Sequence, residues 1–144
     1  MKRLITLSII MSSAFGAYAQ DVEERVTLDE VTVKAAKVVN KADGMIIYPT
    51  DVQKRYSNNG YSILEKLSLA NLRIDNINHT ITAIDNRGEV QLRVDGIVVG
   101  KVEMLALDPK DIAKIDYINN PGVRYGDDIA YVINIITRRS ESGY

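Results

Sequence analysis

The stretch from residue 131 to residue 137, YVINIIT, constrains the fold more than any other part of the chain. Side chains along a strand alternate between the two faces of a sheet, and here both alternating sets are mainly apolar. One set is Tyr131, Ile133 and Ile135, and the other is Val132, Asn134 and Ile136. A strand that is apolar on both sides must be covered on both sides. The sequence therefore predicts a strand in the interior of a sheet.

The residues before this strand predict a short helix, a second strand and two turns. Asp108 suits an N-cap, and Pro109 suits the first helical position, where its missing N–H costs nothing. From Lys114 to Ile118 apolar and charged side chains alternate, which indicates a half-buried strand. A Pro-Gly turn and a Tyr-Gly loop, both within residues 121–126, then lead to the apolar strand.

This succession resembles the end of the plug domain of TonB-dependent outer-membrane transporters. Three runs carry the resemblance: residues 111–116 (DIAKID), 120–126 (NPGVRYG) and 132–138 (VINIITR). The family pattern is an acidic residue and Ile before Ile-Glu-Val, a Pro-containing turn, an aromatic-Gly loop and a closing Ile-Asn-Ile-Ile-Thr-basic strand. The Asn-Pro form with Arg-Tyr after it looks most like the branch common in gut and environmental Bacteroidetes. Asn119-Asn120 departs from the Arg-Gly of many members, whose Arg helps to hold the plug to the barrel wall.

The middle of the chain predicts the rest of a small sheet. A strand at Met45–Tyr48 stops at Pro49, and the capping-box pattern from Ser62 to Glu65 predicts a helix that ends near Asn71. Further strands are expected at 72–75, 80–84 and 89–94, the last turning through Asp95-Gly96 into 97–99. The predicted fold class is α+β, a small mixed β-sheet of five to seven strands with two short helices. The resemblance implies the same architecture over about residues 28–139.

Residues 1–19 have the organisation of a secretory signal peptide. Lys2 and Arg3 supply the positive charge, residues 4–11 the apolar segment, and residues 17–19 (AYA) the small-residue cleavage site. The apolar segment is far shorter than the ~20 residues that span a bilayer. We therefore expect an exported protein, located at the periplasmic side of the outer membrane or free in the periplasm.

Residues 20–44 predict a flexible leader, because charges are frequent and apolar residues are sparse. Within it a short alternating extended stretch is formed by Leu28, Asp29, Glu30, Val31, Thr32 and Val33. The resemblance implies that this stretch is the TonB box, which adds as a strand to the periplasmic domain of TonB. A simple edge strand of the domain, or disorder, stays open as an alternative. The plug domain itself is expected at 45–139, followed by a tail at 140–144.

The composition excludes several kinds of site. The chain has no cysteine and one histidine, His79, so it forms neither disulfides nor a zinc site of usual composition. His79 is expected in an exposed loop, and Asp127-Asp128 supply too few ligands for calcium, which predicts a solvated loop. No phosphate-binding glycine loop or nucleophile elbow is present. We therefore predict no enzyme, no cofactor, and no catalytic or metal residues.

The charge balance argues against nucleic acid as a partner. Removing residues 1–19 takes away two basic side chains and leaves 16 basic against 19 acidic ones, without a basic cluster. The partners that the resemblance implies are the TonB periplasmic domain, an outer-membrane β-barrel and an unidentified small ligand. The function implied is gating, in which TonB pulls on the plug inside a 22-stranded barrel. Candidates for facing ligand or barrel are Arg87, Arg93, Asp95, Arg124 and Tyr125.

The length of the chain leaves three interpretations open. A 22-stranded barrel needs roughly 220 residues in strands alone, and this sequence stops five residues after Arg139. The chain is then the plug portion of a transporter, a free-standing periplasmic plug-like module that binds TonB or a separate barrel, or a structural module without coupling. We favour the first.

Overall fold

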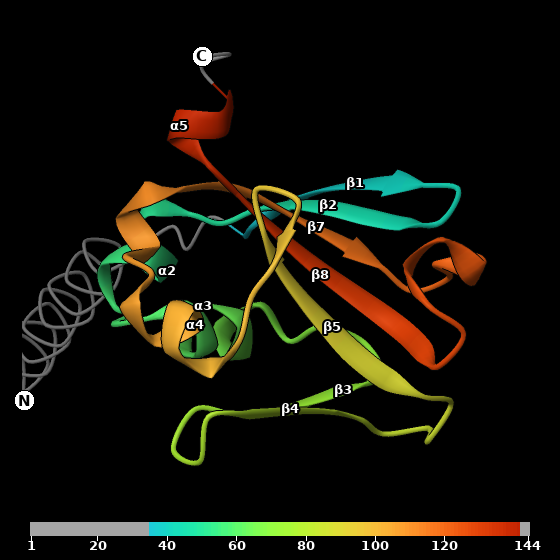
Figure 1. Ribbon diagram of the computed structural model, residues 1–144. Helices are drawn as coiled ribbons and strands as arrows, with labels where there is room; N and C mark the ends of the chain where they lie inside the picture. The colour runs from blue at the N-terminus through green and yellow to red at the C-terminus, as the bar shows by residue number, and fades with distance from the viewer. Residues whose placement is uncertain (1–34, 142–144) are drawn as a thin grey trace, which may run out of the picture. The chain divides into compact units, whose positions relative to one another are not determined.

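The computed structural model describes residues 35–141, so predictions about residues 1–34 and 142–144, including the signal peptide and the segment 28–33, lie outside the described residues. The described part is a mixed α+β fold of eight strands, four short α-helices and two 3₁₀ turns (Figure 1). In chain order the elements are β1 (Lys37–Lys41), β2 (Gly44–Tyr48), α2 (Asp51–Arg55), α3 (Gly60–Leu67), β3 (Leu72–Asp75), β4 (Thr80–Ala83), β5 (Glu89–Val94), β6 (Ile97–Val98), α4 (Lys101–Ala106), η2 (Pro109–Asp111), β7 (Ile112–Ile118), η3 (Gly122–Tyr125), β8 (Ile129–Thr137) and α5 (Arg138–Glu141).

Six of the strands form one mixed sheet, in the order β1-β2-β7-β8-β5-β6. Strand β8 pairs antiparallel with β7 and parallel with β5, whereas the remaining pairs are antiparallel. Strands β3 and β4 form a separate two-stranded sheet. The expected mixed sheet is confirmed, and so is the interior position of residues 131–137. The expectation that residues 72–75 and 80–84 belong to the same sheet was wrong, since these strands pair only with each other.

The core lies on one face of the six-stranded sheet. Tyr131, Ile133 and Ile135 of β8 have no exposed surface there, and Ile115 and Tyr117 of β7 lie beside them. Val132 points to the other face and is also fully buried, so the predicted two-sided burial of the strand is confirmed. Each such apolar side chain contributes about 1.5–3 kcal/mol by its removal from water.

Helices α3 and α4 cover the core face together with the β3–β4 hairpin (Figure 1). Ile63 and Leu64 of α3 and Met104 of α4 have no exposed surface. The two helices approach closely at Gly60, where an added Cβ would lie 2.9 Å from the Met104 carbonyl oxygen. Only glycine fits at this position without a shift of the backbone.

The start and end predicted for the helix that follows the Ser62–Glu65 pattern were wrong. Helix α3 begins at Gly60, because Asn59 is the N-cap and accepts a hydrogen bond from the Ser62 N–H at 2.9 Å. The Ser62 hydroxyl accepts in return from the Asn59 N–H at 3.1 Å, so Ser62 closes the capping box and does not open it. The helix ends at Leu67, since Ser68 adopts left-handed backbone with φ 50°.

The leader and the number of helices also differ from expectation. Residues 37–41, predicted to be flexible, form strand β1, which pairs with β2 along its whole length. Two helices were predicted, but the described residues contain four, and the strand expected at 97–99 is two residues long. Helix α4 follows it directly and carries a Glu103 carboxylate that accepts from the Gly100 N–H at 2.9 Å. The helix predicted after Asp108 is a single 3₁₀ turn.

Candidate functional site

The topology divides the five candidate residues between the two ends of the sheet. Because β5 and β8 are parallel, both begin at one end, which we call the leading end, and both finish at the other, the trailing end. Arg87 precedes β5 and therefore lies at the leading end, and Asp95 follows β5 at the trailing end. The turn between β1 and β2 reaches the leading end as well, since Gly44 is the partner of Ile118.

Three of the five candidates meet in one cluster on the sheet face opposite the core. The ring of Tyr125 lies 4.9 Å from the guanidinium carbon of Arg93 and 5.5 Å from that of Arg124. We call these residues the Arg–Tyr–Arg cluster. Gln91 anchors it from β5, because its amide donates to the Tyr125 carbonyl oxygen at 3.4 Å and its side-chain oxygen accepts from Arg93 at 2.7 Å. Guanidinium–ring contacts at exposed sites are worth about 0.5–1 kcal/mol each.

A chain of ion pairs ties this cluster to the edge of the sheet. Arg124 donates to Asp43 at 3.0 Å, Lys41 lies 3.4 Å from Asp43, and Lys41 lies 2.7 Å from Asp116. Burial by itself would lower the pKa of Lys41. The hydrogen bond to Asp116 and the attraction of its charge outweigh the effect of burial, so the pKa of Lys41 is raised. Burial likewise acts to raise the pKa of Asp43, and Lys41 outweighs it, so that the Asp43 pKa is lowered. Sequence analysis missed Lys41, Asp43 and Asp116 because the pairs join separate elements.

Arg87 belongs to a different arrangement, around the hydroxyl of Tyr131. This hydroxyl donates to the Asp85 carboxylate at 2.5 Å and accepts from Arg87, which also pairs with Asp85 at 2.5 Å. Hydrogen bonds from Tyr131 and Arg87 lower the Asp85 pKa. Burial raises the pKa of Tyr131 and, more strongly, that of Tyr117, so both phenols remain protonated donors near neutral pH. The sequence pattern marked Tyr131 only as an apolar side chain.

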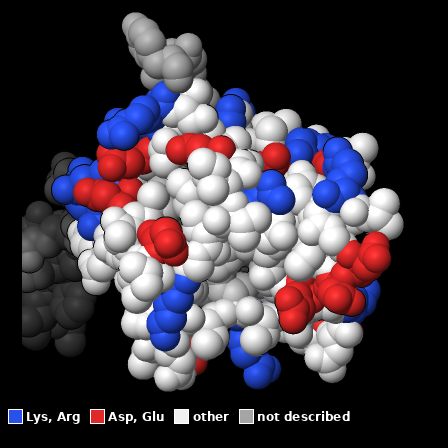
Figure 2. All heavy atoms as spheres, viewed as in Figure 1, with Lys and Arg blue, Asp and Glu red and all other residues white. Residues whose placement is uncertain are grey.

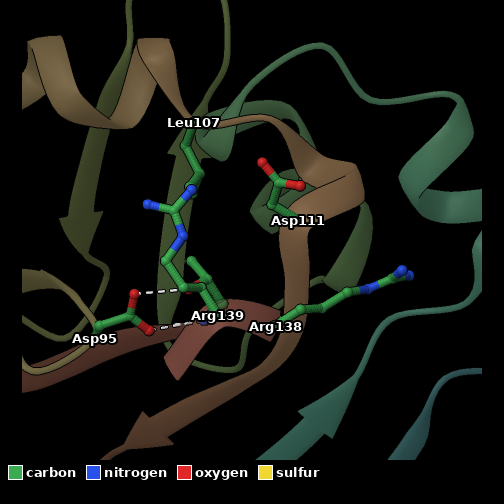
Figure 3. A pocket seen from close by; sticks show the side chains of 6 residues that line it. Asp95, Leu107, Asp111, Arg138 and Arg139 are labelled. Atoms are coloured by element: carbon green, nitrogen blue, oxygen red, sulfur yellow. Dashed lines mark hydrogen bonds between the residues drawn. The ribbon is translucent and has the colours of Figure 1, made fainter. Parts of the chain in front are cut away.

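Asp95 closes the trailing end of β8. Its carboxylate accepts from the Thr137 N–H at 2.8 Å and from the Thr137 hydroxyl at 2.7 Å, as the dashed lines in Figure 3 mark. The neighbouring Gly96 N–H donates to the Asn134 side chain at 3.0 Å. Arg138 and Arg139 follow, and their side chains extend in different directions around a shallow hollow (Figure 3). Asp95 therefore serves to fasten the β5–β6 turn to β8, and the cluster reaches the same turn, because Arg93 donates to the Gly96 carbonyl oxygen at 2.9 Å.

His79, Asp127 and Asp128 take no part in the arrangements described above. His79 was expected to be exposed, but it is half-buried in the β3–β4 turn, with its ring centroid 5.5 Å from that of Tyr61. Asp127 and Asp128 are exposed, and within residues 35–141 no three acidic or histidine side chains gather closely enough to hold a metal ion. A hollow of about 310 Å³ at the leading end is lined by Arg87, Asp127 and the Asn-Pro-Gly segment at 119–122.

The surface charge is mixed. Figure 2 shows basic and acidic side chains interspersed over the visible face, without one continuous basic area. No helix among the described residues is long and apolar enough to cross a membrane. Comparisons with family models, curated proteins and solved structures find no match for this chain.

Proposed function

We propose that this chain is the plug, or gating, domain of a TonB-dependent outer-membrane transporter. The observation that carries the proposal is the ordered run of residues 111–138. Its three family-like pieces form β7, the η3 segment and β8. Strands β7 and β8 make the centre of the sheet, and η3 supplies Arg124 and Tyr125 of the Arg–Tyr–Arg cluster. In this proposal residues 28–33 couple the domain to TonB, and the leading end faces ligand.

The arrangement of charged side chains in the Arg–Tyr–Arg cluster and at the leading end supports a surface that recognises a ligand or a barrel wall. Arg93 and Arg124 are held against Tyr125, and Asp43 orients Arg124 from a second element. A guanidinium positioned in this way presents a planar donor group to carboxylates or other anions. Arg87 borders the hollow at the same end, whereas Asp95 is assigned to holding β8.

The test of coupling is binding of the full exported chain to a purified TonB periplasmic domain. Deletion of residues 28–33 is expected to abolish binding. Within that segment Val31→Pro removes a main-chain N–H and should weaken binding at least tenfold, whereas Val31→Ala keeps the N–H and is the matched control. Equal binding by the two substituted chains, or no binding by the unaltered chain, would overturn the coupling role.

Cell fractionation separates the transporter from a free-standing module. Antibody raised against residues 45–139 should detect a heat-modifiable outer-membrane band much larger than 16.0 kDa if the chain is the plug of a transporter. A band near the size of the exported chain in the soluble periplasm would instead favour the free-standing binding module.

A further inference from the structure

The β3–β4 hairpin, residues 71–84, is a separate unit of the fold. Its main chain closes on itself, because the Ile84 N–H donates to the Asn71 carbonyl oxygen at 2.9 Å in addition to the four strand pairs. Within the described part of the chain, no main-chain hydrogen bond joins this hairpin to the six-stranded sheet. Among the described residues, its one main-chain hydrogen bond to a residue outside the hairpin runs from the Leu72 N–H to the Leu69 carbonyl oxygen at 3.3 Å, so side chains hold the hairpin against the sheet. In Figure 1 it projects below the sheet as a two-stranded arm.

Two buried tyrosines fasten the hairpin, one at each of its ends. Tyr117 and Tyr131 lie on the neighbouring central strands β7 and β8, with stacked rings whose centroids are 6.1 Å apart. The Tyr117 hydroxyl donates to the carbonyl oxygen of Ala70, just before the hairpin, at 2.5 Å. The Tyr131 hydroxyl donates to Asp85, just after the hairpin, at the same distance. The two residues that flank the hairpin are thus each bonded to one hydroxyl of the tyrosine pair.

The backbone next to each fastening point lies in the left-handed region. Asn71 and Asn86 adopt left-handed backbone, with φ values of 63° and 54°, a region that L-residues occupy sparsely. Ser68, with φ 50°, adds a third such residue on the side of α3. Short segments of this kind absorb the dihedral changes of moving elements.

Open hollows border the hairpin on two sides. One, of about 350 Å³, is lined by Ser68, Leu72 and Ile84, among others. Another, of about 400 Å³, is lined by Ile81, Asn86 and other residues. The hairpin packs against the core through one face, which carries Leu72, Ile74, Ile81 and Ala83.

The tip adds only weak contacts. Lys101 donates to the Asn78 carbonyl oxygen at 3.2 Å in an exposed position, and His79 makes a tilted ring contact with Tyr61. An exposed contact such as the one from Lys101 contributes a few tenths of a kcal/mol to about 1 kcal/mol. The two hydroxyl bonds and the apolar face of the hairpin carry most of the attachment.

We propose that the β3–β4 hairpin is a displaceable strap. It swings away together with Ala70 and Asp85, about residues 68–69 and 86–88, once the two tyrosine hydroxyls lose these partners, while the six-stranded sheet stays folded. Its use as the element that opens a path along the sheet rests on the proposed gating function. The displacement itself does not depend on that function.

Hydrogen exchange of the full exported chain, followed by mass spectrometry across low denaturant concentrations, tests the strap. In the unaltered chain the amides of β3 and β4 should exchange through an opening with a smaller denaturant dependence than the opening that exposes β7 and β8, because less surface is uncovered. Tyr131→Phe and Tyr117→Phe should each speed exchange of β3 and β4 by about tenfold, the loss expected for one buried hydrogen bond.

Val132→Ala is the matched control, since Val132 is the neighbour of Tyr131 on β8 and is equally buried on the opposite face. It should speed exchange of β7 and β8 at least tenfold and leave β3 and β4 unchanged, because the face it weakens remains folded when the strap is open. If β3 and β4 share the rates and denaturant dependence of β7 and β8 in every variant, the strap does not exist. That outcome would leave the TonB-binding result untouched, so the two proposals fail independently.

Discussion

Replacing Tyr131 by Phe isolates the hydroxyl that joins the central strand to the segment after β4. The ring stays in its buried position against Tyr117, and only the oxygen is lost, together with its bonds to Asp85 and Arg87. Removing one partner of a buried hydrogen bond costs about 1–3 kcal/mol. Because Asp85 and Arg87 reach the surface and can turn to water, we expect the lower half of that range, about 1–1.5 kcal/mol.

The assay is urea unfolding of the unaltered chain and the variant at pH 7, followed by circular dichroism. For a domain of this size the loss corresponds to a fall in Tm of about 4–12 °C. A double-mutant cycle with Asp85→Ala supplies the internal control, since the two changes remove the same bond and should be less than additive. Strict additivity, or a variant as stable as the unaltered chain, would refute the reasoning.

Three further perturbations follow from the same geometry. The hydrogen bond from Tyr131 lowers the folded-state pKa of Asp85. The stability that this bond contributes is therefore present above the ordinary carboxyl pKa of about 4 and is lost as the pH falls below that value. In urea unfolding from pH 6 to pH 3, the difference in unfolding free energy between the unaltered chain and Tyr131→Phe should narrow. Gly60→Ala gains up to about 1 kcal/mol of helix propensity, but the added Cβ meets the Met104 carbonyl oxygen. We expect the free energy of unfolding to fall by about 1–2 kcal/mol. A rise in thermal stability would contradict the close approach of α3 and α4. Asp95→Ala should speed amide exchange at the last residues of β8 and leave exchange at its first residues unchanged. Uniform exchange along the strand would argue against a role of the Asp95–Thr137 hydrogen bonds in holding the end of β8.

Much of the fold could be predicted because its signals are local. The alternation in residues 114–118 and 131–137 sets which side chains face the core, and the Asp95-Gly96 turn sets the hairpin after β5. The cap of α3 shows the limit of local patterns. Both Asn59 and Ser62 suit an N-cap, and the burial of Gly60 and Tyr61 against the core selects the earlier one. Helix α4 was missed because its six residues have one fully buried side chain, Met104, and no apolar period.

The candidate site could be predicted only in part, for the same reason. Arg93 was selected from a strand, and Arg124 and Tyr125 from a loop, but their meeting depends on how η3 returns over the sheet beside β5. The carboxylate that holds Arg124 is Asp43, 81 positions earlier in the chain. No periodicity or motif connects residues so far apart.

The sequence by itself determined seven of the eight described strands, the buried faces of the central ones and the absence of cysteine chemistry, because hydrophobic alternation, turn residues and composition act over a few neighbouring positions. The tertiary structure decided the pairing of β1 with β2, the parallel pairing of β5 with β8, the bonds from Asp95 to Thr137, and the bonds from the two tyrosine hydroxyls to the residues that flank the β3–β4 hairpin. These features depend on which distant segments meet when the apolar faces are buried together. Burial of apolar surface brings these segments together but is not directional. The hydrogen bonds between the polar groups that are buried with them then fix the geometry.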